Sequence, residues 1–226
     1  MHVDDAIRSR KSVRRFLPVP VPIGTVRHIL EVASRAPSGH NVQPWRAHVV
    51  AGAARDALCA DITAAARDQP DAHQPEYGYY PETWVEPYIS RRRKTGFGLY
   101  AALGIARDDM AARERQMLRN YVLFDAPVGI FVTLDRRLNT GSYMDTGMFL
   151  QNIMVAARGQ GLSTCAQAAF AWFHGIARRH LPMSEHELLV CAIALGHEDT
   201  AAPENAFLTE RAPLADFTTF HGFEGR

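Results

Sequence analysis

One stretch of this chain decides its fold: Ala36-Pro37-Ser38-Gly39-His40-Asn41-Val42-Gln43-Pro44-Trp45. Proline and glycine favour a tight bend at such a place. The bend leaves backbone N–H groups and short polar side chains free to bond a flat heterocycle, and Asn41 and Gln43 each offer a donor and an acceptor. Taken alone, the stretch is more typical of an ordinary turn between a helix and a strand. Its meaning therefore depends on the rest of the chain.

The residues on both sides of this bend fit a helix before it and a strand after it. Apolar residues recur at helical spacing after Gly24 and predict an amphipathic helix that stops at residues 36–39: Val26, Ile29, Leu30 and Ala33. Residues 45–50 alternate as in a strand, and the alternating apolar positions are Trp45, Ala47 and Val49. The bend therefore connects two regular elements.

A second polar motif, Arg10-Lys11-Ser12-Val13-Arg14, lies near the N-terminus. In an extended chain Arg10, Ser12 and Arg14 share one face, because side chains alternate. Two guanidinium groups and a hydroxyl then converge on one anion. Arginine suits phosphate because its planar fork donates two charge-assisted hydrogen bonds. A solvated basic turn is an equally simple explanation of the motif by itself.

The remaining sequence predicts alternating helices and strands. Helical patterns cover residues 4–10, 53–67, 107–121 and 144–160. The last of these is apolar on most faces, so we expect it to be buried centrally or against a partner subunit. Continuous apolar runs at 128–134 and 188–195 predict buried strands. Such a mixture implies an α/β or α+β fold with a covered sheet.

Residues 69–98 interrupt this alternation. They carry four prolines, many aromatic residues and the basic run Arg91-Arg92-Arg93-Lys94. We expect an irregular segment here. A long aromatic-rich insertion of this kind is more typical of a functional lid or a dimer arm than of a linker.

Composition excludes several classes of protein. The 226 residues suit one domain, and 47% hydrophobic with 22% charged residues is ordinary globular usage. A net charge of +1 gives no chain-wide attraction to nucleic acid or to an anionic membrane. No apolar run reaches the roughly 18 residues of a membrane helix, and the N-terminus is not a signal peptide. Three widely spaced cysteines argue against a disulfide framework or a zinc site and favour the cytoplasm.

The two polar motifs together resemble the FMN-binding signature of the nitroreductase family. Four further segments match in the same order: 147–157 resembles the central dimer helix, 159–170 the loop under the flavin, 194–197 the last core strand, and 211–213 the C-terminal phosphate arginine. The resemblance runs over residues 4–220. It implies an α+β nitroreductase-like flavoprotein fold, with a mainly antiparallel sheet flanked by helices. It also implies one domain over 1–226, an intertwined homodimer with swapped tails, and FMN sites at the dimer interface.

The resemblance also implies roles for individual residues. Arg10, Lys11 and Arg211 would hold the FMN phosphate with help from Ser12, and Arg14 would lie near the pyrimidine edge of the ring. A fixed cation there raises the redox potential of the flavin. Residues of the partner subunit would line the ring: Pro37, Ser38, Gly39, Asn41 and, with weaker support, Gln43. Backbone N–H groups of one segment would face N5 and O4 of the flavin: Ala166, Gln167, Ala168 and Ala169. His40 either contacts the substrate or faces water.

The implied activity is oxidoreduction. NADH or NADPH would reduce FMN in a ping-pong mechanism, and a nitroaromatic, quinone or similar small conjugated acceptor would take the electrons. The physiological acceptor and the choice of pyridine nucleotide stay open. So do two alternatives: another activity of the same superfamily, such as reductive dehalogenation or flavin cleavage, and a flavin-binding protein without turnover.

Some motifs point elsewhere and are set aside. Residues 96–101 fit the dinucleotide pattern G-x-G-x-x-A but follow no predicted strand, which that motif needs. Residues 161–165 lack the last glycine of a serine-hydrolase elbow, and Cys165 is interpreted as a buried filler. The histidines show no metal-binding spacing, so no metal site is expected.

Overall fold

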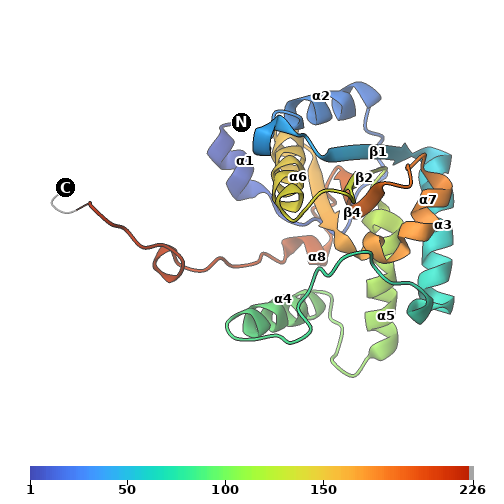
Figure 1. Cartoon of the computed structure of the whole chain (residues 1–226). Helices are drawn as coiled ribbons and strands as arrows, with labels where there is room; N and C mark the ends of the chain where they lie inside the picture. The colour runs from blue at the N-terminus through green and yellow to red at the C-terminus, as the bar shows by residue number, and fades with distance from the viewer. Residues whose placement is uncertain (224–226) are drawn as a thin grey trace.

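The computed structural model describes residues 1–223 and is built on a four-stranded sheet (Figure 1). The strands are β1 (Trp45–Ala51), β2 (Val128–Asp135), β3 (Ser163–Gln167) and β4 (Glu187–Gly196). Their order across the sheet is β1-β2-β4-β3, and every pair is antiparallel. The prediction of a mainly antiparallel sheet is therefore confirmed.

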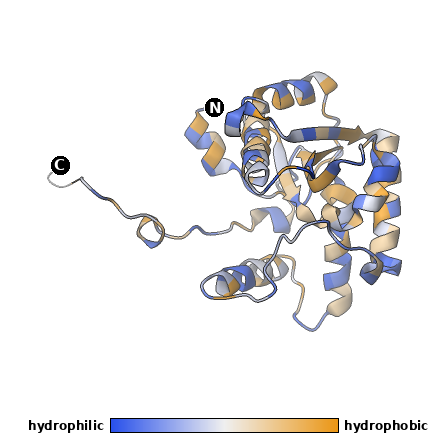
Figure 2. Cartoon of the chain, viewed as in Figure 1, coloured by the Kyte–Doolittle hydropathy of each residue, from blue (hydrophilic) through white to orange (hydrophobic). Residues whose placement is uncertain are grey.

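Helices cover both faces of the sheet, so the two central strands, β2 and β4, are buried along almost their whole length. On one face α2 (Ile23–Ala33) and α6 (Gly141–Gly159) pack through Ile29, Phe149 and Ile153 against Ile130 and Ile193. The other face is covered by α3 (Gly52–Asp68), α7 (His174–His180) and the 3-10 segment η4 (Ala168–Phe173). Figure 2 shows the apolar residues concentrated between these layers. The α+β class follows from this arrangement.

The N-terminal segment extends the sheet beyond β3. After the short helix α1 (Val3–Ser9) the chain is extended, and Ser12 forms a parallel bridge with Thr164. The N–H of Val13 donates to the carbonyl of Thr164 at 3.0 Å. Val13 and Phe16 are buried, because they anchor this segment in the core on the β3 side. The side chains at 10, 12 and 14 are left half-buried.

The remaining elements lie outside these layers. Between β1 and β2 the chain adds η2 (Pro70–Ala72), α4 (Tyr88–Ala102), α5 (Met110–Leu118) and η3 (Arg119–Asp125). After β4 come α8 (Pro203–Ala206) and η5 (Leu214–Asp216). Beyond α8 the chain leaves the body as an extended tail (Figure 1), and its large apolar residues are exposed: Leu208, Leu214, Phe217, Phe220 and Phe223.

Three expectations from the sequence are wrong. Residues 69–98 are not irregular throughout, because α4 begins at Tyr88. Residues 163–167 form strand β3, where the sequence had indicated only a loop. In β1, Val49 is exposed and Val50 is buried, since the two sides of this edge strand are covered unequally.

No helix within residues 1–223 combines the length and apolar character that crossing a bilayer requires.

Candidate active site

Strand β3 organises the candidate site, because the N-terminal motif lies along its free edge. Cys165 is buried in the middle of β3, and burial raises the pKa of its thiol. The charges of Arg14 and Arg10 and a hydrogen bond with Ser12 oppose that rise. The thiol is therefore a protonated filler, as expected from the sequence. The polar groups of the N-terminal motif are assembled around it on one side of the strand.

A cationic cavity of about 600 Å³ lies between α1, the end of α6 and the tail. Five of its lining side chains are basic and one is acidic: Arg8, Arg10, Lys11, Arg158 and Arg211, with Glu198. Burial, and then the like charge of Arg211, lowers the pKa of Arg10 below its ordinary value. Cations held so close together form a site for a multivalent anion.

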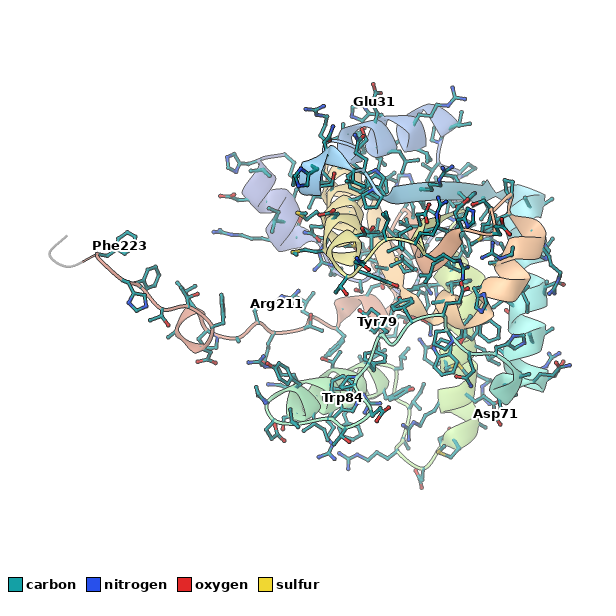
Figure 3. All side chains as sticks on the ribbon, in the orientation of Figure 1. Glu31, Asp71, Tyr79, Trp84, Arg211 and Phe223 are labelled. Atoms are coloured by element: carbon teal, nitrogen blue, oxygen red, sulfur yellow. The ribbon has the colours of Figure 1, made fainter. Side chains whose placement is uncertain are left out.

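The cations of this cavity are not equivalent. The ammonium of Lys11 pairs with Glu198 at 2.7 Å and donates to the carbonyl of Asn205 at 2.6 Å. Its charge is therefore offset within the protein, and it ties the N-terminal segment to the chain around α8. Arg10 and Arg211 form no ion pair within residues 1–223. Arg211 lies on the outgoing tail between α1 and α4 (Figure 3).

Arg158 also lines the cavity, and the sequence analysis missed it. It stands in the last turn of α6 and donates to the hydroxyls of Ser9 and Ser163 at 3.3 and 3.2 Å. These contacts hold its guanidinium beside the start of β3. A basic residue after a long apolar helix, close in sequence to the matched loop at 159–170, is the signal that could have revealed it.

An open pocket of about 470 Å³ lies at the other end of β3. The segment Ala166–Ala169 lines it together with aromatic side chains from three other parts of the chain: Tyr77, Tyr79, Tyr80, Tyr121, Trp172 and Phe173. None of the described residues that line it is charged. Because η4 begins at Ala168, the first N–H groups of this segment have no partner within the helix. The pocket thus offers a flat apolar space with backbone donors at one edge.

The bend at residues 37–43 lies elsewhere, beside the N-terminal end of α6. His40, Asn41 and Gln43 all have positive φ, at 48°, 57° and 50°. The hydroxyl of Ser38 accepts from the N–H of Gln43 at 2.9 Å, and the N–H of Gly39 donates to the Asp145 carboxylate at 3.3 Å. His40 and Asn41 are exposed. Left-handed conformations in exposed non-glycine residues are frequent at functional sites.

The structure therefore assembles the predicted site residues in three groups. Arg10, Lys11 and Arg211 share the cationic cavity, with Ser12 and Arg14 next along the strand. Residues 166–169 line the aromatic pocket. In a single chain, neither cavity includes the bend with Pro37, Ser38, Gly39, His40, Asn41 and Gln43.

The glycine motif at 96–101 lies inside helix α4. A dinucleotide loop would require a preceding strand and a helix that starts at the glycines. Setting this motif aside is therefore confirmed.

Comparison with known proteins identifies the fold. A family model described as "Nitroreductase family" matches residues 7–197. The chain is 41% identical over 218 residues to a nitrobenzene nitroreductase of Ectopseudomonas oleovorans, which covers 96% of both chains. It is 42% identical to a 4-nitrobenzoate reductase of a Nocardioides species, over 96% of this chain and 89% of the relative. The solved FMN- and NADPH-dependent nitroreductase NfnB from Sphigopyxis sp. strain HMH superposes with a TM-score of 0.95 at 37% identity, covering 99% and 100% of the two chains.

Proposed function

Because this chain belongs to the nitroreductase family, we propose that it is an FMN-dependent enzyme that uses NADPH or NADH to reduce nitroaromatic compounds. Support comes from relatives that cover nearly the whole chain and are named for nitrobenzene, chloronitrobenzene or nitrobenzoate reduction. A structural neighbour at 30% identity was solved with NADPH. The observation that carries the proposal is the pair of unlike cavities at the two ends of β3, one cationic and one apolar.

The cationic cavity fits the phosphate of FMN. Arg10, Arg158 and Arg211 would donate to its oxygens, because their guanidinium groups are gathered without enough carboxylate to balance them. Lys11 lines the same cavity, but its pairing with Glu198 gives it mainly an anchoring role. A bound dianion would also relieve the repulsion between Arg10 and Arg211.

The segment between the two cavities fits the ring of the flavin. Arg14 and Ser12 lie along the edge of β3, and the segment Ala166–Ala169 at its end lines the pocket. A bound FMN would supply the transfer of hydride and electrons between the nicotinamide and the acceptor, and both substrates would use the one pocket in turn, in a ping-pong sequence. The side chains of this chain position the ring and exclude water.

The pocket favours an uncharged substrate. Burying a carboxylate without a cationic partner costs several kcal/mol of free energy. A difference of that size in binding free energy separates a good substrate from a poor one. A tyrosine hydroxyl is protonated at neutral pH, and burial raises the pKa of Tyr121 further, so this hydroxyl can donate a hydrogen bond to a nitro oxygen. We therefore expect nitrobenzene to be preferred over 4-nitrobenzoate.

We propose a homodimer as the active form. The bend at 37–43 lies apart from both cavities in one chain, and the tail beyond α8 exposes several large apolar side chains. A second copy would cover the tail and bring its own bend, with His40 as a candidate substrate contact, onto the ring.

The segment before α4 carries Tyr79 and Tyr80 over the pocket and would act as its lid. Three free buried cysteines agree with the cytoplasm as the compartment.

The test is direct. The purified protein should be yellow, with about one FMN per chain, and should oxidise NADPH or NADH when nitrobenzene is added. The value of kcat/KM for nitrobenzene should exceed that for 4-nitrobenzoate by about tenfold or more, which follows from the uncharged pocket. A colourless protein that also refuses added FMN would overturn the proposal. Binding of FMN without turnover of any acceptor would favour a carrier, and turnover of halogenated phenols alone would favour a dehalogenase.

A further inference from the structure

A continuous run of aromatic rings leads out of the apolar pocket. The ring of Tyr77 is 6.3 Å from that of Tyr79, which is 4.7 Å from Tyr80, and Tyr80 is 5.5 Å from Trp84. Tyr77 is fixed because its hydroxyl donates to the carbonyl of Val190 at 2.5 Å. The three tyrosines line the pocket, whereas Trp84 lies beyond it against α4 (Figure 3). We call these four residues the aromatic ladder.

The outer end of the aromatic ladder carries a positioned cation. The guanidinium of Arg92 stacks over the Trp84 ring, 5.0 Å from its centroid. The neighbouring cations are placed differently: Lys94 pairs with Glu210 at 2.6 Å, and Arg91 lines a separate cavity between α4 and the tail. Within residues 1–223, Arg92 has no acidic ion-pair partner, although Glu86 lies in the preceding turn and accepts from Ser90. Arg92 is thus a cation at the outer end of the aromatic ladder that forms no ion pair within residues 1–223.

A nicotinamide in the pocket leaves the rest of its dinucleotide outside. The pocket is uncharged and suits the nicotinamide ring, while the phosphates and the adenosine must follow the surface. The aromatic ladder offers exposed planar rings at the pocket, with Tyr79 61% and Tyr80 67% exposed. Purine bases stack on such rings, and arginine binds phosphate through two parallel hydrogen bonds.

We propose that Trp84 and Arg92 bind the adenosine 2′-phosphate end of NADPH, so that this enzyme prefers NADPH to NADH. The inference rests on the proposed function, since it assumes that a pyridine nucleotide enters the pocket. NADH would keep the stacking on the ladder and lose only the contact with Arg92. Neither Trp84 nor Arg92 lines the pocket, so we expect the carboxylate of a single-ring substrate held there not to contact Arg92.

The test compares Arg92→Gln with Arg93→Gln in the FMN-loaded enzyme. Arg93 is the adjacent exposed arginine, with no aromatic partner within residues 1–223, and serves as the matched control. Arg92→Gln should raise KM for NADPH by roughly tenfold to a hundredfold, the usual loss for one charged hydrogen-bonding partner. It should leave KM for NADH, kcat and FMN content unchanged. Arg92→Lys should recover part of the NADPH preference.

A binding measurement separates this inference from the proposed function. Adenosine 2′,5′-bisphosphate should bind the FMN-loaded wild type and the Arg93→Gln variant alike in calorimetry, and bind Arg92→Gln and Trp84→Ala at least about tenfold more weakly. This arm needs no turnover, so it remains decisive even if no nitroaromatic is reduced. Equal losses for NADPH and NADH, an equal effect of Arg93→Gln, or unchanged binding of the bisphosphate would each overturn the assignment. A raised KM for 4-nitrobenzoate alone would assign Arg92 to an acidic substrate instead.

Discussion

Removing the buried carboxylate of Glu187 should destabilise the fold by an amount that depends on pH. This side chain stands at the start of β4, and its residue is 4% exposed. Burial by itself would raise its pKa, but hydrogen bonds from Thr133 at 2.6 Å, from His48 at 2.6 Å and from the N–H of Ser184 at 2.9 Å outweigh burial. The pKa is lowered from 4.5 to about 2.

The lowered pKa gives the size and the sign of the effect. At about 1.4 kcal/mol per unit, the shift contributes about 3 kcal/mol of stability at neutral pH. Because the folded-state pKa lies below the unfolded value, the contribution is complete above pH 4.5 and is lost as the pH falls toward 2. By pH 3.5, about 2 kcal/mol of it should remain.

The assay is urea unfolding of the wild type and Glu187→Gln at pH 7 and at pH 3.5, at one protein and FMN concentration. The wild type should be more stable by about 3 kcal/mol at pH 7, and the gap should narrow at the lower pH. Glu185→Gln is the control, since that side chain is 86% exposed and its loss should change stability by less than about 0.5 kcal/mol. A gap that is the same at both pH values would refute the reasoning.

Two further predictions concern the flavin site and helix α4. Arg10→Glu and Arg211→Glu should each weaken FMN binding by about a hundredfold or more, because each places a negative charge beside the phosphate; unchanged affinity of both variants in fluorescence titration would contradict the phosphate assignment. Gly96→Ala should stabilise the protein by up to about 1 kcal/mol, because it lies inside α4 with open space around it. Gly98→Ala should give no such gain in thermal unfolding, since its added Cβ would lie 2.4 Å from the Phe207 ring; equal stabilisation by both changes would show that this ring moves aside freely.

The sequence predicted those elements whose faces bury regular apolar patterns. Strands β2 and β4 were found because helices cover both of their faces, and α2 and α6 were found from their apolar positions. The sequence did not predict strand β3, because its buried side chains include the polar residues Ser163, Thr164 and Gln167. Thr164 is paired with the N-terminal segment and the amide of Gln167 donates to the carbonyl of Asn120 in η3, and both of these partners are distant in sequence. No local pattern records that burial.

The sequence did not predict helix α4 either, for the opposite reason. None of its residues is buried, so no apolar stripe marks it, and it carries two glycines and a basic run. Its position depends on contact with the chain after α8, where Gly98 meets Phe207. A helix that is held by contacts with residues distant in sequence leaves little signal in its own sequence.

The resemblance predicted which residues would gather in the cationic cavity. It did not predict which neighbours each of them contacts, because those contacts depend on the fold. Arg10 and Arg211 share one cavity, as the resemblance implied. Lys11 was expected beside the phosphate as well, but its pairing with Glu198 depends on how β4 ends next to the N-terminal segment. The position of Arg158 follows from the hydroxyls of Ser9 and Ser163, which only the fold brings to it.

The bend at residues 37–43 is also the most strained part of the candidate site. His40, Asn41 and Gln43 adopt left-handed backbone angles that cost on the order of 1 kcal/mol each for non-glycine residues. Several hydrogen bonds within the chain hold this shape, among them those from Gln43 to Ser38 and from Gly39 to Asp145. Since α6 supplies Asp145 at one end and Arg158 at the other, one helix fixes both the bend and a wall of the cationic cavity. This helix therefore sets the distance between the bend and the cationic cavity of the same chain.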